Sequence, residues 1–193
     1  MNNTIWQIRI PRTGTSSIGV HLRENPLKHN QLYSYGHNGY SKKINDYLSR
    51  NGNLIKIVNL RDPVEHTISL HSYIFHYKAY QENEKNIVND FSKWVRHYDL
   101  EDYFVKFFDE ERRDVSWCLN ILDDFKVFNT ATLKYDFNQF LAEIGEAKSF
   151  DLHESNLKGV EISDEDIKYI KNIRSKDYEL IMGVNENIIS DLY

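Results

Sequence analysis

The fold of this chain is decided by one stretch of sequence, Leu54-Ile55-Lys56-Ile57-Val58-Asn59-Leu60-Arg61-Asp62-Pro63-Val64-Glu65. Its first part is nearly continuous in apolar residues, which is typical of a central parallel strand with both faces covered. Asp62 then offers an N-cap, Pro63 suits the first position of a helix, and Glu65 follows the cap at the spacing of a capping box. A buried strand that passes directly into a helix indicates an α/β domain.

Apolar periodicity predicts strands and helices on both sides of this stretch. Short β-rich runs bounded by turn residues predict further strands at residues 5–10, 32–35 and 125–128. Helical spacing predicts helices around residues 18–25, 91–108, 115–122, 137–144 and 163–170. The helix that begins at Pro63 should pack through Val64, Ile68, His71 and Phe75. We therefore expect one α/β domain over residues 1–193, with a mostly parallel sheet of about four to five strands flanked by helices.

The composition narrows the classes of partner. Of the 193 residues, 40% are hydrophobic and 13% aromatic, which is enough to bury a continuous core. The net charge of −5 disfavours nucleic acid and anionic membranes as partners, so an anionic ligand would need a local site. Neither a signal peptide nor a long apolar segment is evident, and we expect a cytoplasmic protein. Cys118, the single cysteine, lies in an apolar stretch and should be a buried thiol.

The segment after the first predicted strand is a candidate anion site. Arg12-Thr13-Gly14-Thr15-Ser16-Ser17 joins a strand to a helix, so its backbone N–H groups and the positive helix end can face an anion. It has neither the spacing nor the lysine of G-x-x-x-x-G-K-[ST], so an ATP or GTP loop is not indicated. Taken alone, it fits an ordinary strand-to-helix turn equally well.

A second candidate lies after the central strand. Arg61 follows the carboxyl end of that strand, where ligands collect in open parallel sheets, and Ser69 lies on the next helix. An arginine fork with a nearby hydroxyl suits a phosphate group. The alternative is that Arg61 pairs with Asp62 or Glu65 as a structural tie. Two such segments in one sheet favour a phosphate ligand over that tie.

Both segments match motifs of one family. Ile10-Pro11-Arg12-Thr13-Gly14-Thr15-Ser16-Ser17 resembles the 5′-phosphosulfate loop of sulfotransferases, P-K-T-G-G-T-S or P-K-T-A-S-T-S. Leu60-Arg61-Asp62-Pro63-Val64-Glu65-His66-Thr67-Ile68-Ser69 resembles their 3′-phosphate motif, R-D-P-x-E-R-x-x-S. Tyr35-Gly36-His37 looks like the G-H loop of the carbohydrate 2-O-sulfotransferase-like branch, and residues 124–128 with 133–136 are similar to later family segments.

This resemblance implies a P-loop NTPase-like sulfotransferase fold and a co-substrate, 3′-phosphoadenosine 5′-phosphosulfate (PAPS). By position, the loop Thr13, Gly14, Thr15, Ser16 and Ser17 would hold the 5′-phosphosulfate, and Arg61 with Ser69 the 3′-phosphate. Arg12 stands where the family usually has a catalytic lysine; it keeps the charge but replaces a compact ammonium with a planar fork. Leu157-Lys158-Gly159 resembles the family's R-K-G motif only weakly, so Lys158 is assigned no firm role.

Transfer to a hydroxyl also needs a base. Histidine is the side chain best poised near neutral pH, and the position of His37 in the family motif makes it our candidate, with His66 and His71 as rivals. No metal-ligand spacing such as H-E-x-x-H is present, so no metal is expected. The acceptor would be a carbohydrate or another small hydroxyl compound, while the oligomeric state is left open. Two alternatives stay open: a non-catalytic PAPS-binding protein and a P-loop-like small-molecule kinase.

Overall fold

The computed structural model describes residues 3–25, 30–33, 39–50, 53–77, 85–109, 114–146, 149–152 and 160–190. These residues contain a four-stranded sheet, formed by β1 (Asn3–Ile8), β2 (Asn30–Tyr33), β3 (Asn53–Leu60) and β4 (Phe125–Asn129). The order is β2-β1-β3-β4, and each neighbouring pair is parallel. The predicted α/β class, the mostly parallel sheet and the central position of residues 54–60 are therefore confirmed.

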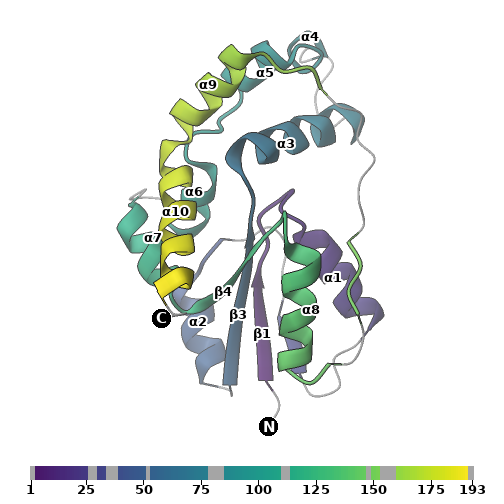
Figure 1. Cartoon of the computed structure of the whole chain (residues 1–193), viewed down its shortest axis with the longest axis vertical. Helices are drawn as coiled ribbons and strands as arrows, with labels where there is room; N and C mark the ends of the chain where they lie inside the picture. The colour runs from purple at the N-terminus through teal and green to yellow at the C-terminus, as the bar shows by residue number, and fades with distance from the viewer. Residues whose placement is uncertain are drawn as a thin grey trace.

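Helices cover both faces of the sheet and its carboxyl end (Figure 1). On one face lie α1 (Thr15–Glu24) and α8 (Leu133–Glu143). On the other lie α2 (Lys42–Ser49), α6 (Tyr103–Phe108), α7 (Val115–Leu122) and α10 (Ser175–Ser190). Beyond the carboxyl ends of the strands, a third group consists of α3 (Pro63–Tyr77), α4 (Lys85–Val88), α5 (Phe91–His97) and α9 (Asp164–Ile173). Among these helices, α2, α4 and α10 lie where no helix was expected.

The side chains of β3 alternate between the two faces of the sheet, and each face packs against its own apolar core. Ile57 packs with α1 and α8, whereas Val58 and Leu60 pack on the side of α7 and α10. A strand buried on both faces is the reason for its nearly continuous apolar sequence. Because all four strands are parallel, their carboxyl ends meet at one end of the sheet, which is its upper end in Figure 1 and faces α3.

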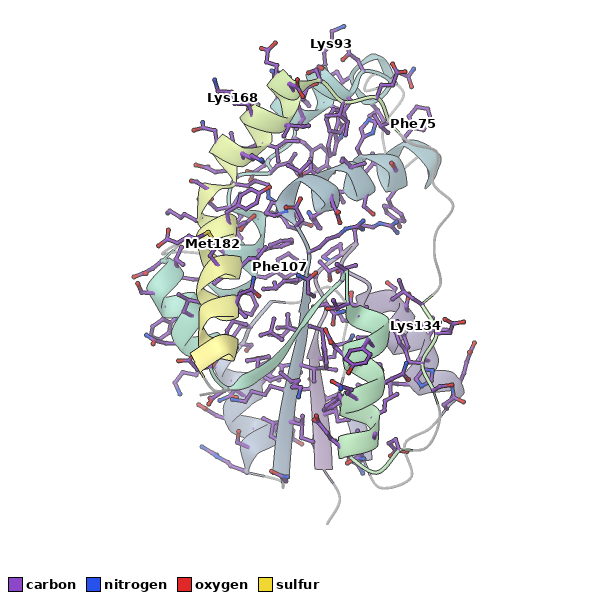
Figure 2. The ribbon with its side chains drawn as sticks, in the orientation of Figure 1. Phe75, Lys93, Phe107, Lys134, Lys168 and Met182 are labelled. Atoms are coloured by element: carbon purple, nitrogen blue, oxygen red, sulfur yellow. The ribbon has the colours of Figure 1, made fainter. Side chains whose placement is uncertain are left out.

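The start of α3 follows the prediction, but one residue of its packed face does not. Asp62 Oδ1 accepts hydrogen bonds from the backbone N–H groups of Val64 (2.9 Å) and Glu65 (3.0 Å), which confirms the N-cap. His71 is buried as expected, whereas Phe75 is 40% exposed at the far end of α3 (Figure 2). Ile74 takes the buried position instead, because the helix packs on α5 and α9 through the stripe that contains Leu70, His71 and Ile74.

The single cysteine is a core residue. Cys118 is buried, and burial raises the pKa of its thiol to about 12, as expected for an inert core cysteine. Among the helices of the described ranges, none combines the length and the apolar character needed to cross a bilayer.

Candidate anion-binding site

A cleft of about 620 Å³ opens at the carboxyl ends of β1, β3 and β4. It collects residues from four separate parts of the chain, which is the arrangement expected of a ligand site in an open parallel sheet. Six predicted residues line it: Arg12, Gly14, Ser16, Ser17, Arg61 and Ser69. The other lining residues are Val20, Glu65, Thr130, Ala131 and Leu152.

The side chains of Thr13 and Thr15 do not face this cleft. Both are buried, and each hydroxyl donates to the carbonyl oxygen of Ile10 at 2.9 Å. The hydroxyls of these two predicted ligand residues therefore stabilise the conformation of the loop by bonding to its backbone. Any contact that they make with an anion would come from their backbone N–H groups.

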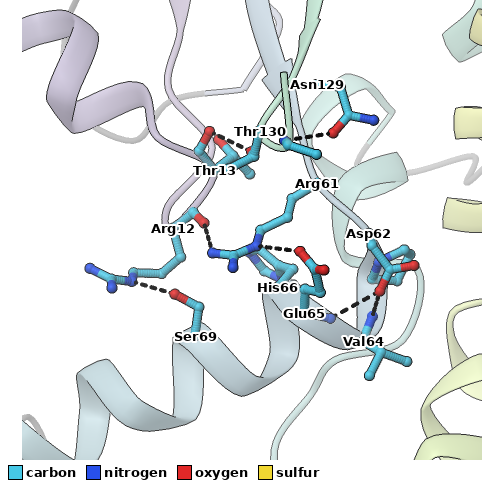
Figure 3. A network of polar contacts seen from close by, with 12 residues as sticks. Arg12, Thr13, Arg61, Asp62, Val64, Glu65, His66, Ser69, Asn129 and Thr130 are labelled. Carbon is cyan, nitrogen blue, oxygen red and sulfur yellow. Dashed lines mark hydrogen bonds and ion pairs between the residues drawn. The ribbon is translucent and has the colours of Figure 1, made fainter. Parts of the chain in front are cut away.

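The next three carbonyl groups of the loop are also held by side chains. Pro11 O lies 2.9 Å from His66 Nε2. Arg12 O accepts from Arg61 Nη1 at 3.4 Å, and Thr13 O accepts from Thr130 Oγ1 at 2.9 Å (Figure 3). The described residues contain no cis peptide bond. Because C=O and N–H point in opposite directions in a trans peptide, the N–H groups of Arg12, Thr13 and Gly14 point away from these three side chains.

Gly14 completes the loop geometry. It has φ +84° and precedes α1 as its N-cap, a conformation that glycine adopts without strain. A Cβ atom at this position would lie 2.6 Å from Leu133 Cδ2, so a larger residue has no room. Gly14, Ser16 and Ser17 place the N-terminus of α1 at the cleft, and the positive end of a helix favours a bound anion.

Arg12 has a strained backbone and a side chain directed to α3. Its φ is +64°, a left-handed value that costs a residue with a Cβ about 1–2 kcal/mol. Its Nε donates to Ser69 Oγ at 3.2 Å, and its guanidinium carbon lies 5.1 Å from the centre of the Tyr73 ring. The guanidinium therefore lies beside the predicted 3′-phosphate residue Ser69 (Figure 3).

Arg61 forms a structural tie and also lines the cleft. Its Nε lies 3.4 Å from Glu65 Oε2, and its Nη1 donates to Arg12 O, so it is a structural tie between the loop and α3. It also lines the cleft and keeps 26% of its side chain exposed. Since the Glu65 carboxylate is 59% exposed and screened by water, a phosphate group could replace it as the partner of Arg61.

The two rival histidines are structural. His66 is buried, and both ring nitrogens contact protein groups, Nε2 with Pro11 O and Nδ1 with Arg174 Nη1 at 2.9 Å. His71 is also buried, with Nε2 2.8 Å from Val88 O. Burial lowers the pKa of both rings. His37 and Lys158 lie outside the described residues.

The residues missed by sequence reasoning come mainly from later in the chain. Thr130 follows β4 and joins two loops, since its hydroxyl lies 2.9 Å from both Thr13 O and Leu60 O. The rule that ligands collect beyond strand ends could have identified Thr130 and Ala131. Leu152 carries no comparable signal.

Within the described ranges, no group of three or more histidine, cysteine, aspartate or glutamate side chains is placed to hold a metal ion. Comparison with protein families gives no matching family model, and comparison with curated proteins gives no match.

Proposed function

We propose that this protein binds PAPS in the cleft and transfers its sulfuryl group to a hydroxyl acceptor, on a P-loop NTPase-like sulfotransferase fold. The observation that carries this proposal is the convergence of Arg12, Arg61 and Ser69 with the N-terminus of α1 on one cleft. Two arginines and a helix end offer charge-assisted hydrogen bonds to more than one phosphate group.

The two anion-binding parts of the cleft suit a nucleotide with phosphates at both ends of its ribose. The loop and the first turn of α1 would take the 5′-phosphosulfate, and Arg61 with Ser69 would take the 3′-phosphate. Val20, Ala131 and Leu152 add apolar lining, against which a flat base can pack. The 3′-phosphate distinguishes PAPS from ATP.

In the proposed reaction, the acceptor oxygen attacks sulfur in line while adenosine 3′,5′-bisphosphate leaves. The N–H groups at the start of α1 would stabilise negative charge on the leaving phosphate oxygen, and the Arg12 guanidinium would join them by moving from Ser69 to that oxygen when the phosphosulfate is bound. His37 would accept the proton of the acceptor hydroxyl. A carbohydrate or another small hydroxyl compound is the acceptor class.

One observation favours a second candidate, a protein that binds PAPS without turning it over. Arg12 donates to Ser69, whereas a residue that replaces the family's lysine would need to reach the bridging oxygen of the phosphosulfate. Release of adenosine 3′,5′-bisphosphate from PAPS in an acceptor screen separates the two functions.

Titration calorimetry tests the ligand assignment directly. Adenosine 3′,5′-bisphosphate should bind at least about tenfold more tightly than 5′-AMP or ADP, since only the first carries the 3′-phosphate that Arg61 and Ser69 would contact. Equal affinities for the three nucleotides would overturn the assignment of a 3′-phosphate site.

A further inference from the structure

The contacts of His66 determine its protonation state. A carbonyl oxygen can only accept a hydrogen bond and a guanidinium can only donate one. Nε2 faces Pro11 O and Nδ1 faces Arg174 Nη1, each at 2.9 Å. The ring is therefore neutral, with its hydrogen on Nε2, and it donates to the loop while accepting from Arg174.

Arg174 is held by several buried partners. It stands between α9 and α10 and is fully buried, as is Asp177, whose Oδ2 lies 2.6 Å from Arg174 Nη2. Arg174 Nε donates to Asp177 Oδ2 at 2.7 Å. The two hydrogens of Nη1 are shared among His66 Nδ1, Pro63 O at 2.9 Å and Thr67 Oγ1 at 3.0 Å. The ring of His66 is thus held against a buried ion pair, which gives it one orientation.

Asp177 extends the same network into α6. Its Oδ1 accepts hydrogen bonds from the backbone N–H groups of Phe104 (2.8 Å) and Val105 (3.1 Å). The rings of Tyr103 and Phe104 lie 5.0 and 4.8 Å from the ring of His66. Contacts from α6, α9 and α10 therefore converge on a histidine whose remaining hydrogen bond goes to the loop that borders the cleft.

The peptide between Pro11 and Arg12 is the point where this network reaches the cleft. Its carbonyl is held by His66, and the next torsion along the chain is the left-handed φ of Arg12, +64°. The orientation of this peptide, together with that torsion, directs the Arg12 side chain to Ser69. A rotation of the peptide would move both the Arg12 N–H group and the guanidinium.

We propose that His66 is a positioning residue for the anion site: through its hydrogen bond to Pro11 O, and backed by Arg174, it holds the loop in the conformation that binds the ligand. This inference rests on the proposed function, because it concerns the same cleft. His66 is buried and is not among the residues that line the cleft. It nevertheless contributes to the affinity of the cleft for an anion.

Burial, followed by the nearby Arg174, lowers the pKa of His66 well below its usual value. The ring therefore stays neutral over the physiological range, which keeps the hydrogen on Nε2 available to the loop.

Three variants test the proposal, with inorganic pyrophosphate and adenosine 3′,5′-bisphosphate as probes in calorimetry. His66→Gln keeps one donor and one acceptor and should bind both probes within about threefold of the unmodified protein. His66→Phe keeps a ring but loses both hydrogen bonds and should bind both probes at least about tenfold more weakly. Thr67→Val is the matched control: it removes an acceptor from the same Arg174 Nη1 without touching the loop, and it should bind normally.

A folded His66→Phe protein with unchanged affinity would overturn the proposal, and so would a Thr67→Val protein that is weakened as much as His66→Phe. If His66→Phe does not fold, nitrogen NMR of the unmodified protein decides. A hydrogen on Nε2, with a signal that moves when pyrophosphate is added, supports the proposal; a hydrogen on Nδ1, or a signal that does not respond, overturns it.

The two probes separate this inference from the proposed function. Binding of pyrophosphate without any preference for the bisphosphate nucleotide would contradict the PAPS assignment, while the comparison of variants with pyrophosphate would still measure the role of His66. A protein that binds neither probe has no anion site to position, and both proposals would fall.

Discussion

Arg12 Nε donates a hydrogen bond to Ser69 Oγ at 3.2 Å, although the two residues lie 57 positions apart in the chain. The contact joins the loop after β1 to the helix after β3, which are the two segments whose sequences resemble sulfotransferase motifs. A guanidinium at this position adds charge to the 3′-phosphate side of the proposed site.

Arg12 should contact the 3′-phosphate of adenosine 3′,5′-bisphosphate, because its side chain lies at Ser69. Arg12→Ala should weaken binding of adenosine 3′,5′-bisphosphate by about 10- to 100-fold and binding of 5′-AMP much less, because the guanidinium lies at Ser69. Calorimetry with both nucleotides measures this difference. Equal losses for the two nucleotides would place Arg12 at the 5′ end. Arg12→Lys restores the usual residue of the resembling family and should keep or raise turnover if Arg12 occupies the place of that lysine.

Arg61→Ala should weaken binding of adenosine 3′,5′-bisphosphate by about one to two orders of magnitude, because it removes a charge-assisted contact to phosphate. Arg23→Ala, which removes an exposed arginine from α1, is a matched control for the change in net charge and should bind normally. Circular dichroism of both variants checks the fold. Loss of folding in Arg61→Ala alone would show that the tie to Arg12 O and Glu65 is its main role.

His37→Ala should leave binding of the donor nearly intact while turnover falls by about 10²–10⁴-fold, the usual effect of removing a general base. His97→Ala, on the exposed end of α5, is the control and should keep full activity. Steady-state kinetics with PAPS and an accepted hydroxyl compound provide the measurement. A fully active His37→Ala enzyme would point to a carboxylate base, because His66 and His71 are buried and bonded to backbone carbonyls.

Transferase activity should survive EDTA, because Arg12, Arg61 and the N-terminus of α1 supply positive charge at the cleft. The assay is release of adenosine 3′,5′-bisphosphate from PAPS before and after chelation. Complete loss that magnesium restores would favour the small-molecule kinase.

Asp166 should contribute stability that acid removes. Although burial alone raises its pKa, hydrogen bonds from Ser92, Arg96 and Ser163 lower the pKa of this carboxyl to about 2. A folded-state pKa below the ordinary value means that the contribution is present above about pH 4 and is lost as the pH falls towards 2. Asp166→Asn should therefore lower the free energy of unfolding by about 1–2 kcal/mol at pH 6, with a smaller difference at pH 3.

Urea unfolding at the two pH values measures this effect. Asp164→Asn, in the exposed first turn of the same helix, is the control for the loss of one negative charge, and it should lower the free energy of unfolding less than Asp166→Asn at pH 6. An equal loss for Asp166→Asn at both pH values would contradict the role of its ionised form.

Local signals predicted most of the elements, because they depend on residues that are close in sequence. The apolar run of β3 and the cap at Asp62 are examples, and both are found as expected. The amphipathic signal of α10 was missed, although this helix supplies Asp177. The motif spacing also predicted that Arg12, Arg61 and Ser69 would lie near one ligand, and all three line one cleft.

The remaining features of the site depend on partners that are distant in sequence. Nothing near residue 66 indicates that its ring meets Arg174, 108 positions later, or that Thr130 holds Thr13 O across 117 positions. The left-handed backbone of Arg12 is likewise set by these contacts, since arginine has no preference for it. Thr13 and Thr15 look like ligand residues by composition, and only the fold shows that their hydroxyls bond to Ile10 O.

The hydrogen bond from Arg174 to His66 also orders events during synthesis of the chain. The loop at Pro11 is made well before the residue that backs its hydrogen bond, which lies 163 positions further on, between α9 and α10. A ribosome-bound chain can pair β1 with β3 long before Arg174 and Asp177 leave the exit tunnel. The cleft would thus acquire its final shape only after α9 and the start of α10 have been made, and a nascent chain stalled before α9 would carry both motif-like segments without the buried ion pair behind them.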